Sequence, residues 1–379
     1  MKKKTKGYKQ RLNNLLIVLL LSAMLLVMST YAWFTANKTV NVDNIDVKVS
    51  TSSGLQISAD GVDWKTVLTK ADIENALDNG YTLARNQLPK EMAPVSTDMT
   101  ISTLGTLNMY FGDVYADLNP DSTTYGEYVL ESELVSTGVD GTGKTISLEE
   151  DGTEGKYIAF DVFLKSGSVA KDLYMSGNVI ELKENGVDAD GNTLYDEVTR
   201  QTDESGISYA TRVGVIRGEN TDSSASPATI RNLRTTNGST VLWEPNYDCH
   251  TANGVANAIG LGWFTSTDVA EGAENQYLNY DALNQAFTAP AELSSLRTGF
   301  GAADKVTRMT PTGISKRGEV ANVAFPKDTA AGNALDSGIT KLRIYMWVEG
   351  QDVDAENYAA GTFVEYSVSF SLDPFLANP

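Results

Sequence analysis

The chain has 379 residues, of which 41% are hydrophobic, so the composition supplies enough apolar surface for a core and excludes a wholly disordered protein. Six of the 30 basic residues lie within the first 32 positions, where no acidic residue occurs. The 24 basic residues that remain face 49 acidic ones, an excess of negative charge that disfavours nucleic acid and anionic lipid as partners. A single cysteine excludes an intrachain disulfide.

An apolar run from Leu15 to Trp33 follows the basic cluster. It is 19 residues long and contains no charged residue. A helix of this length spans about 28 Å, close to the thickness of a bilayer's hydrocarbon core. Because basic flanks stay on the cytoplasmic side, the pattern predicts that the chain after Trp33 is exported.

The sequence around Ala32 allows two fates for this apolar helix. Thr30-Tyr31-Ala32 fits the small-x-small pattern of a signal-peptidase site, with Ala32 last and Trp33 first in the mature chain. The apolar run is longer than the h-region of a typical signal peptide, which leaves a retained anchor as the alternative. Residues 1–32 are therefore predicted to be a signal peptide or an N-terminal membrane anchor, and residues 33–379 an extracellular domain.

The first strand of the exported part is predicted at residues 40–49. Val40 and Val42 alternate with polar residues, and Ile45, Val47 and Val49 do so in a phase shifted by one residue. Such a shift predicts a bulge or a break in the strand. Further along, the turn-forming residues 58–61 lie between short apolar runs and predict a hairpin. Residues 71–79, which Gly80 follows, predict a short helix.

Alternation of apolar and polar residues recurs in three later segments and predicts strands with one apolar face. The apolar positions are Ile158, Phe160, Val162 and Leu164; Leu342, Ile344, Met346 and Val348; and Val364, Tyr366, Val368, Phe370 and Leu372. The predicted fold class is all-β, an elaborated antiparallel β-sandwich with an N-terminal apolar helix. Three stretches rich in small polar residues, near 117–154, 201–237 and 265–308, are predicted to be long loop insertions.

Two acidic segments raise the hypothesis of calcium binding. Asp188, Asp190 and Asn192 have the spacing that begins an EF-hand loop, but Thr193 replaces the glycine required at the sixth position and Thr199 the glutamate at the twelfth. An ordinary Asp-Gly-Asn turn between two strands explains the same residues without a metal. The second acidic segment contains Glu349, Asp352 and Asp354. No other cofactor is predicted.

The residues that could perform catalysis do not form a recognisable set. Cys249 and His250 are adjacent, so on a strand their side chains point to opposite faces, and the chain has no other histidine. No spacing singles out a pair of carboxylates. We therefore predict that the protein is not an enzyme. Trp243, Trp263 and Phe264 are interpreted as core residues, with stacking on sugar rings as the alternative.

Two segments resemble known surface proteins. Residues 30–35, Thr-Tyr-Ala-Trp-Phe-Thr, together with the strand that follows, resemble the signal-peptide junction of the TasA/camelysin group. These are secreted, fibre-forming biofilm-matrix proteins of Gram-positive bacteria with a jelly-roll sandwich. Residues 344–352 and the strand at 363–372 look like the end of uncharacterised clostridial surface proteins. The resemblance implies a jelly-roll-like fold, cleavage after Ala32 and assembly into fibres.

If this resemblance holds, the first strand becomes a candidate donor strand. An extended segment that leaves its own domain can complete the sheet of the next subunit, because β-strand addition satisfies a whole row of backbone groups. The candidate residues are Val40, Val42, Ile45, Val47 and Val49. The alternative is that the same residues pair within their own sheet.

The predicted function is that of an exported structural or cell-surface protein, located outside the cell, that assembles with itself or with other surface proteins. Its apolar helix would enter the cytoplasmic membrane at least during export. A membrane-tethered adhesin or carbohydrate-binding module is the second hypothesis, and an extracellular hydrolase is the third. Nucleic acid is not an expected partner.

Overall fold

The computed structural model describes residues 40–49, 54–76, 86–116, 128–139, 141–147, 154–167, 171–188, 193–197, 207–243, 322–325, 337–350 and 363–373. Several predictions concern residues outside these ranges: the apolar helix, the Ala32/Trp33 cleavage site, the loop at 265–308, and the side chains of Cys249, His250, Trp263 and Phe264. Within the described ranges, no helix is both long enough and apolar enough to cross a membrane.

The chain divides into two compact units. One comprises residues 38–112 and 132–379 and contains both large sheets. The other comprises residues 1–37 and 113–131, of which the structure describes the last residues of one strand, 113–116, and the first of the next, 128–131.

The larger sheet, sheet A, has eight strands. Six of them follow the order β10-β4-β1-β18-β12-β13, while β16 pairs with β12 and β3 pairs with β1. The strands are β10 (Glu154–Gly155), β4 (Glu91–Met92), β1 (Val40–Val49), β18 (Phe363–Ser371), β12 (Leu173–Val187), β13 (Thr193–Glu197), β16 (Asn322–Phe325) and β3 (Val67–Thr69).

The second sheet, sheet B, has five strands in the order β15-β14-β17-β11-β2, each antiparallel to its neighbours. They are β15 (Ser239–Trp243), β14 (Thr211–Thr221), β17 (Gly338–Val348), β11 (Ile158–Ser166) and β2 (Gln56–Ser58). Two smaller sheets contain β5 (Ser96–Ile101), β6 (Leu107–Ala116) and β7 (Tyr128–Leu134), and β8 (Thr137–Val139) and β9 (Thr145–Ser147). Three short helices are α2 (Lys70–Glu74), α3 (Ile207–Ala210) and α4 (Pro227–Arg231).

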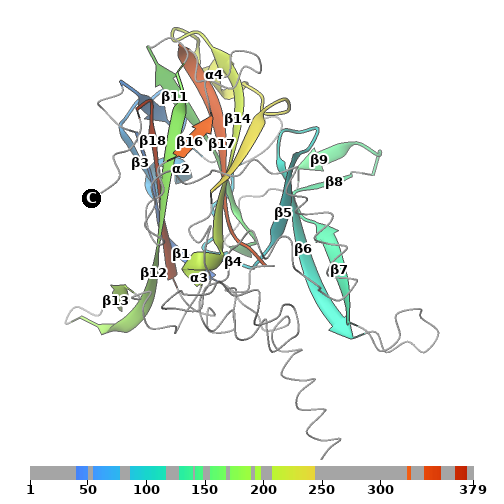
Figure 1. The fold of residues 1–379 in the computed structure, drawn as a ribbon. Coiled ribbons are helices and arrows are strands. Elements are labelled where there is room, and N and C mark those ends of the chain that lie inside the picture. Colours follow the sequence, from blue (N-terminus) through green and yellow to red (C-terminus); the bar gives the residue numbers. More distant parts are fainter. Residues whose placement is uncertain are drawn as a thin grey trace, which may run out of the picture. The chain divides into compact units, whose positions relative to one another are not determined.

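One hydrophobic core joins the two large sheets. It combines buried side chains of β1, β12 and β18 with those of β11, β14, β15 and β17. Figure 1 shows β12 and β18 facing β14 and β17. The all-β prediction is confirmed, and so is the alternating pattern of β18, in which Val364, Tyr366, Val368 and Phe370 are buried between partly exposed residues.

The sequence analysis predicted an antiparallel sandwich, but sheet A contains parallel pairs as well. β1 runs parallel to β18, and β4 runs parallel to β10. Parallel neighbours need a long connection, and for β1 and β18 that connection is the whole chain between Val49 and Phe363. The predicted irregularity in β1 is confirmed, because its register against β18 shifts between Val42 and Asn44.

Two inner strands of sheet B, β11 and β17, are buried on both faces, although their alternating sequences predicted one apolar and one polar face. Every residue of β17 is buried. On the face turned away from the main core, Tyr345 and Trp347 pack with Leu107 and Met109 of β6. The alternation in sequence therefore separates two buried environments, and polar residues such as Arg343 are enclosed with the apolar ones.

Two of the three predicted loop insertions contain strands. Segment 117–154 contains the whole of β7, β8 and β9, and segment 201–237 contains β14, an inner strand of sheet B. In β14, Val213 and Val215 face the main core, whereas Arg212, Gly214 and Arg217 interrupt the apolar pattern. All these residues are buried. The polar composition of the segment therefore led to the prediction of a loop where the structure has a core strand.

The smaller predictions near the chain's start are confirmed in outline. Residues 59–63 form the bend that follows β2, and Ile57 and Lys65 on either side of it exchange backbone hydrogen bonds. The predicted helix is present as α2, which ends earlier than expected at Glu74. Trp243 lies in the core with 2% of its surface exposed, as interpreted.

The position of Trp243 also explains why residue 177, in the opposite sheet, is a glycine. A Cβ added to Gly177 of β12 would lie 2.7–2.9 Å from three ring atoms of Trp243, closer than side chains tolerate. We predict that Gly177→Ala lowers the free energy of unfolding by about 1–3 kcal/mol, the usual cost of overpacking. Urea unfolding measures the change. Gly167→Ala is the control because its added Cβ meets no atom within 4 Å; equal losses in both variants would refute the contact.

Candidate functional site at the first strand

β1 occupies the centre of sheet A. Its backbone pairs with β18 from Asn41 to Val49, with Val47 opposite Val368. The strand that was predicted as a donor thus lies within its own sheet in this single chain. This is the arrangement named above as the alternative, and it defines the slot that any donated strand would have to fill.

The other edge of β1 is held by two strands and a helix. β4 pairs with residues 40–41 and β3 with residues 46–48. Between them, at the bulge, the backbone N–H of Val42 donates to the carbonyl of Lys90 at 2.8 Å, and Nζ of Lys70 donates to the carbonyl of Val42 at 2.9 Å. Backbone groups that the bulge removes from the ladder are thereby satisfied.

The side chains of β1 fill the main core. Val42, Ile45, Val47 and Val49 are between 0% and 6% exposed and belong to the cluster that joins the two sheets. Val40, the fifth predicted donor residue, pairs through its backbone with Met92. β1 is therefore held by four apolar side chains in the core and by backbone hydrogen bonds along both edges.

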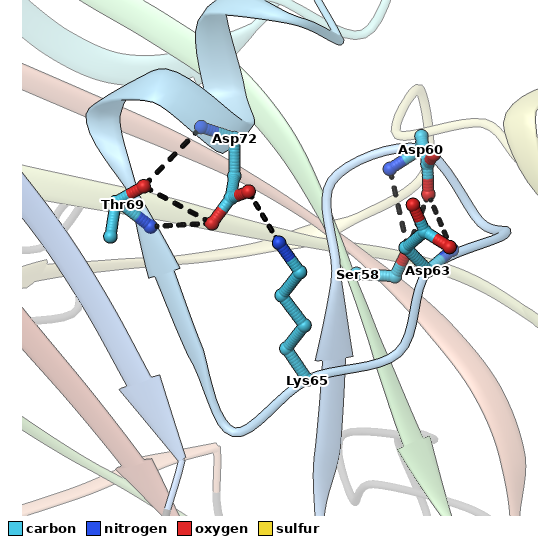
Figure 2. A network of polar contacts seen from close by, with 6 residues as sticks. All are labelled: Ser58, Asp60, Asp63, Lys65, Thr69 and Asp72. Atoms are coloured by element: carbon cyan, nitrogen blue, oxygen red, sulfur yellow. Dashed lines mark hydrogen bonds and ion pairs between the residues drawn. The ribbon is translucent and has the colours of Figure 1, made fainter.

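The helix that supplies Lys70 starts at a capping box (Figure 2). Thr69 caps α2: its hydroxyl accepts from the N–H of Asp72, and its own N–H donates to the Asp72 carboxylate at 3.0 Å. Nζ of Lys65 also donates to that carboxylate. The hydrogen bond from Lys65, followed by that from Thr69, lowers the pKa of Asp72 below its ordinary value.

A second acidic residue in Figure 2 stabilises the turn before Lys65. Asp60 accepts hydrogen bonds from the backbone N–H groups of Val62 and Asp63 and from the hydroxyl of Ser58. Partial burial raises the pKa of Asp60, but these hydrogen bonds outweigh it and leave the pKa below its ordinary value. Nε of Arg231 in α4 donates to the carbonyl of Asp60 at 2.7 Å. The turn is structural and positions the strand segment that leads to α2.

Of the predicted calcium residues, the structure describes Asp188, directly after β12, and Glu349, directly after β17. Asp190, Asn192, Asp352 and Asp354 lie outside the described residues. β12 and β13, on either side of residues 188–192, pair antiparallel, as the turn interpretation predicted. Glu349 accepts a hydrogen bond from Nε1 of Trp347 at 3.1 Å. Across the described ranges, no group of three or more His, Cys, Asp or Glu side chains is arranged to hold a metal ion.

Sequence reasoning missed Lys70 and the capping box that orients it. The signal was present, because Thr69-Lys70-Ala71-Asp72 matches the Ser/Thr-x-x-Asp/Glu pattern of a capped helix start. What could not be inferred was that the side chain of Lys70, the first residue of this helix, reaches a carbonyl 28 positions earlier in the chain.

No protein-family model matches this chain, and no curated protein is significantly similar to it in sequence. The fold itself defines the class: this is an all-β protein with two facing sheets, in which the first and last described strands are neighbours.

The capping box gives a pH-dependent prediction. Since the pKa of Asp72 is lowered in the folded state, its contribution is present at neutral pH and is lost as the pH falls below about 4. We predict that Asp72→Ala lowers the free energy of unfolding by about 0.5–1 kcal/mol at pH 7, in the range for lost caps, and by less at pH 3. Denaturant unfolding at the two pH values measures this. Glu74→Ala, exposed on the same helix, is the control; an equal loss at both pH values contradicts the prediction.

Proposed function

We propose that this chain is an exported structural protein of the cell surface, with a jelly-roll-like sandwich, that assembles by donating β1 to a neighbouring copy. The observation that carries the proposal is the slot between β18 on one side and β3 and β4 on the other. β1 fills it with a ladder that a single bulge interrupts and with four buried side chains.

Exchange of β1 keeps the contacts that the single chain already makes. Val47, for example, would meet Val368 and Leu68 of a neighbour in place of its own. Because an exchanged element reproduces the same interface, its cost lies mainly in opening the chain, and a high local concentration favours it. When every copy donates to the next and the ring does not close, a filament results.

Export is supported by sequence. The six basic residues before the apolar run at 15–33 favour a cytoplasmic start and an extracellular remainder. Cleavage after Ala32 would leave a short segment before β1, and that segment would give the strand freedom to move. An acidic, exported sandwich with a removable first strand is suited to assembly with copies of itself.

The exchange is tested by placing one cysteine on each side of the β1–β18 ladder. Lys48 and Ser369 are opposite each other and partly exposed, so cysteines there lie within disulfide range. We predict that Lys48→Cys and Ser369→Cys chains, each also carrying Cys249→Ser, form a mixed disulfide dimer after they are refolded together at high concentration. Mass spectrometry of the oxidised mixture identifies the heterodimer.

Two controls make this result decisive. The double variant with both cysteines in one chain reports the disulfide within a single molecule. Lys48→Cys mixed with Thr229→Cys, exposed on α4, measures random collision. If the double variant is oxidised within the chain while the mixture gives no more heterodimer than the Thr229 control, strand exchange is refuted.

Export and processing have their own test. We predict that protein recovered from the culture supernatant of a Gram-positive host begins at Trp33, as determined by intact mass and N-terminal sequencing. A full-length species found only in membranes would contradict the free donor segment and would favour the tethered adhesin.

A further inference from the structure

Four charged or amide side chains are buried together on the outer face of sheet B. Asp161 of β11 lies opposite Arg343 of β17, and Lys341 is two residues from Arg343 on the same face. Asn86 approaches from the other edge of β11. Their exposed fractions are 0% for Asn86 and Asp161, 1% for Arg343 and 6% for Lys341.

Apolar clusters enclose these four residues at both ends. Along the same face of β11 and β17, one cluster contains Ala159, Tyr345 and Trp347, and the other contains Phe163 and Ile339. The group is therefore shielded from water, and the interactions inside it act in a low-dielectric environment.

Asp161 fixes the position of the lysine amine. Its Oδ1 accepts from Nη1 of Arg343 at 3.0 Å, and its Oδ2 lies 2.8 Å from Nζ of Lys341. Nε of Arg343 donates to the hydroxyl of Tyr345 at 2.9 Å, which holds the guanidinium in place. The amine of Lys341 thus rests against a carboxylate that can accept its proton.

The carboxamide of Asn86 is polarised at one atom and unpaired at the other. Its Oδ1 accepts from the backbone N–H of Asp161 at 2.9 Å and from Nη1 of Arg343 at 3.3 Å. Two donors on one carbonyl oxygen are the arrangement that stabilises a tetrahedral oxyanion. Within the described part of the chain, Nδ2 of Asn86 has no hydrogen-bond partner, which is unfavourable for a buried polar group.

From these contacts we propose that Lys341 and Asn86 form an intramolecular isopeptide bond. Asp161 takes a proton from the lysine ammonium, and the free amine attacks Cγ of Asn86. The oxyanion is held by the Asp161 N–H and by Arg343. The bond from Cγ to Nδ2 then breaks, and Asp161 returns the proton to the leaving nitrogen. One amide bond forms, one breaks, the lysine's remaining surplus proton leaves with the nitrogen as ammonium, and no oxidant or other reactant is needed.

The product relieves two unfavourable features of the buried group. The unpaired Nδ2 leaves, and the positive charge of Lys341 is lost, while Arg343 and Asp161 remain as a pair of opposite charges. Fixed proximity can supply much of the barrier reduction for such a reaction. The bond would join the segment at Asn86 to β17 across β11, a covalent link that a single cysteine cannot provide. This inference is independent of strand exchange.

The unmodified sequence carries its own assay. Trypsin cuts after Arg85 and Lys90, releasing fragment 86–90, and an acylated Lys341 is not cut, so fragment 328–343 stays whole. We predict that folded full-length protein yields these two fragments as one branched peptide, lighter than their sum by one ammonia molecule. If most molecules yield unlinked fragments, with cleavage at Lys341, the proposal is overturned, and the cluster is an ion-pair network only.

Variants test the roles within the reaction. Lys341→Met and Asp161→Asn are expected to abolish the branched peptide, whereas Lys165→Met, a change to a lysine on the neighbouring strand that lies over Trp64, is expected to keep it. Persistence of the mass loss in Lys341→Met would assign it to another reaction and overturn the proposal. The assay of the unmodified sequence remains decisive even if a variant fails to fold.

Discussion

The parallel ladder between β1 and β18 is the contact on which the architecture depends. It joins residues more than 300 positions apart and occupies the middle of sheet A, so the strands on both sides align on it. Its inward side chains, such as Val47 and Val368, meet those of sheet B in the main core. Without this ladder, sheet A would be two separate ribbons, and sheet B would lose the surface that covers one of its faces.

Sequence periodicity identified most of the strands that have apolar alternation, including β1 with its bulge, β11, β17 and β18. It failed for a strand whose two faces are both buried, one in the main core and the other against a second apolar cluster. In β14, the missing side chain of Gly214 leaves room for Trp347 and Leu107, and Arg212 is enclosed although it is charged. A single sequence shows neither the covering strands nor the partners of such residues, so a core strand was predicted as a loop.

The candidate site divides in the same way. The apolar residues of β1 could be predicted because they follow a local rule of alternation. The slot around them could not, because it is made by β18, β3, β4 and Lys70, which come from distant segments. The cluster around Asp161 is a still clearer case: Asn86, Asp161 and Lys341 are separated by long stretches of chain, and no local motif connects them.

The distance in sequence between β1 and β18 also has a consequence for the order of synthesis. Contacts of such high contact order form late, because the loop that they close is long. The centre of sheet A cannot assemble until the segment through Ser371 has been made. During that interval the growing chain has no completed sandwich, and the backbone groups of β1 that later pair with β18 do not yet have that strand beside them.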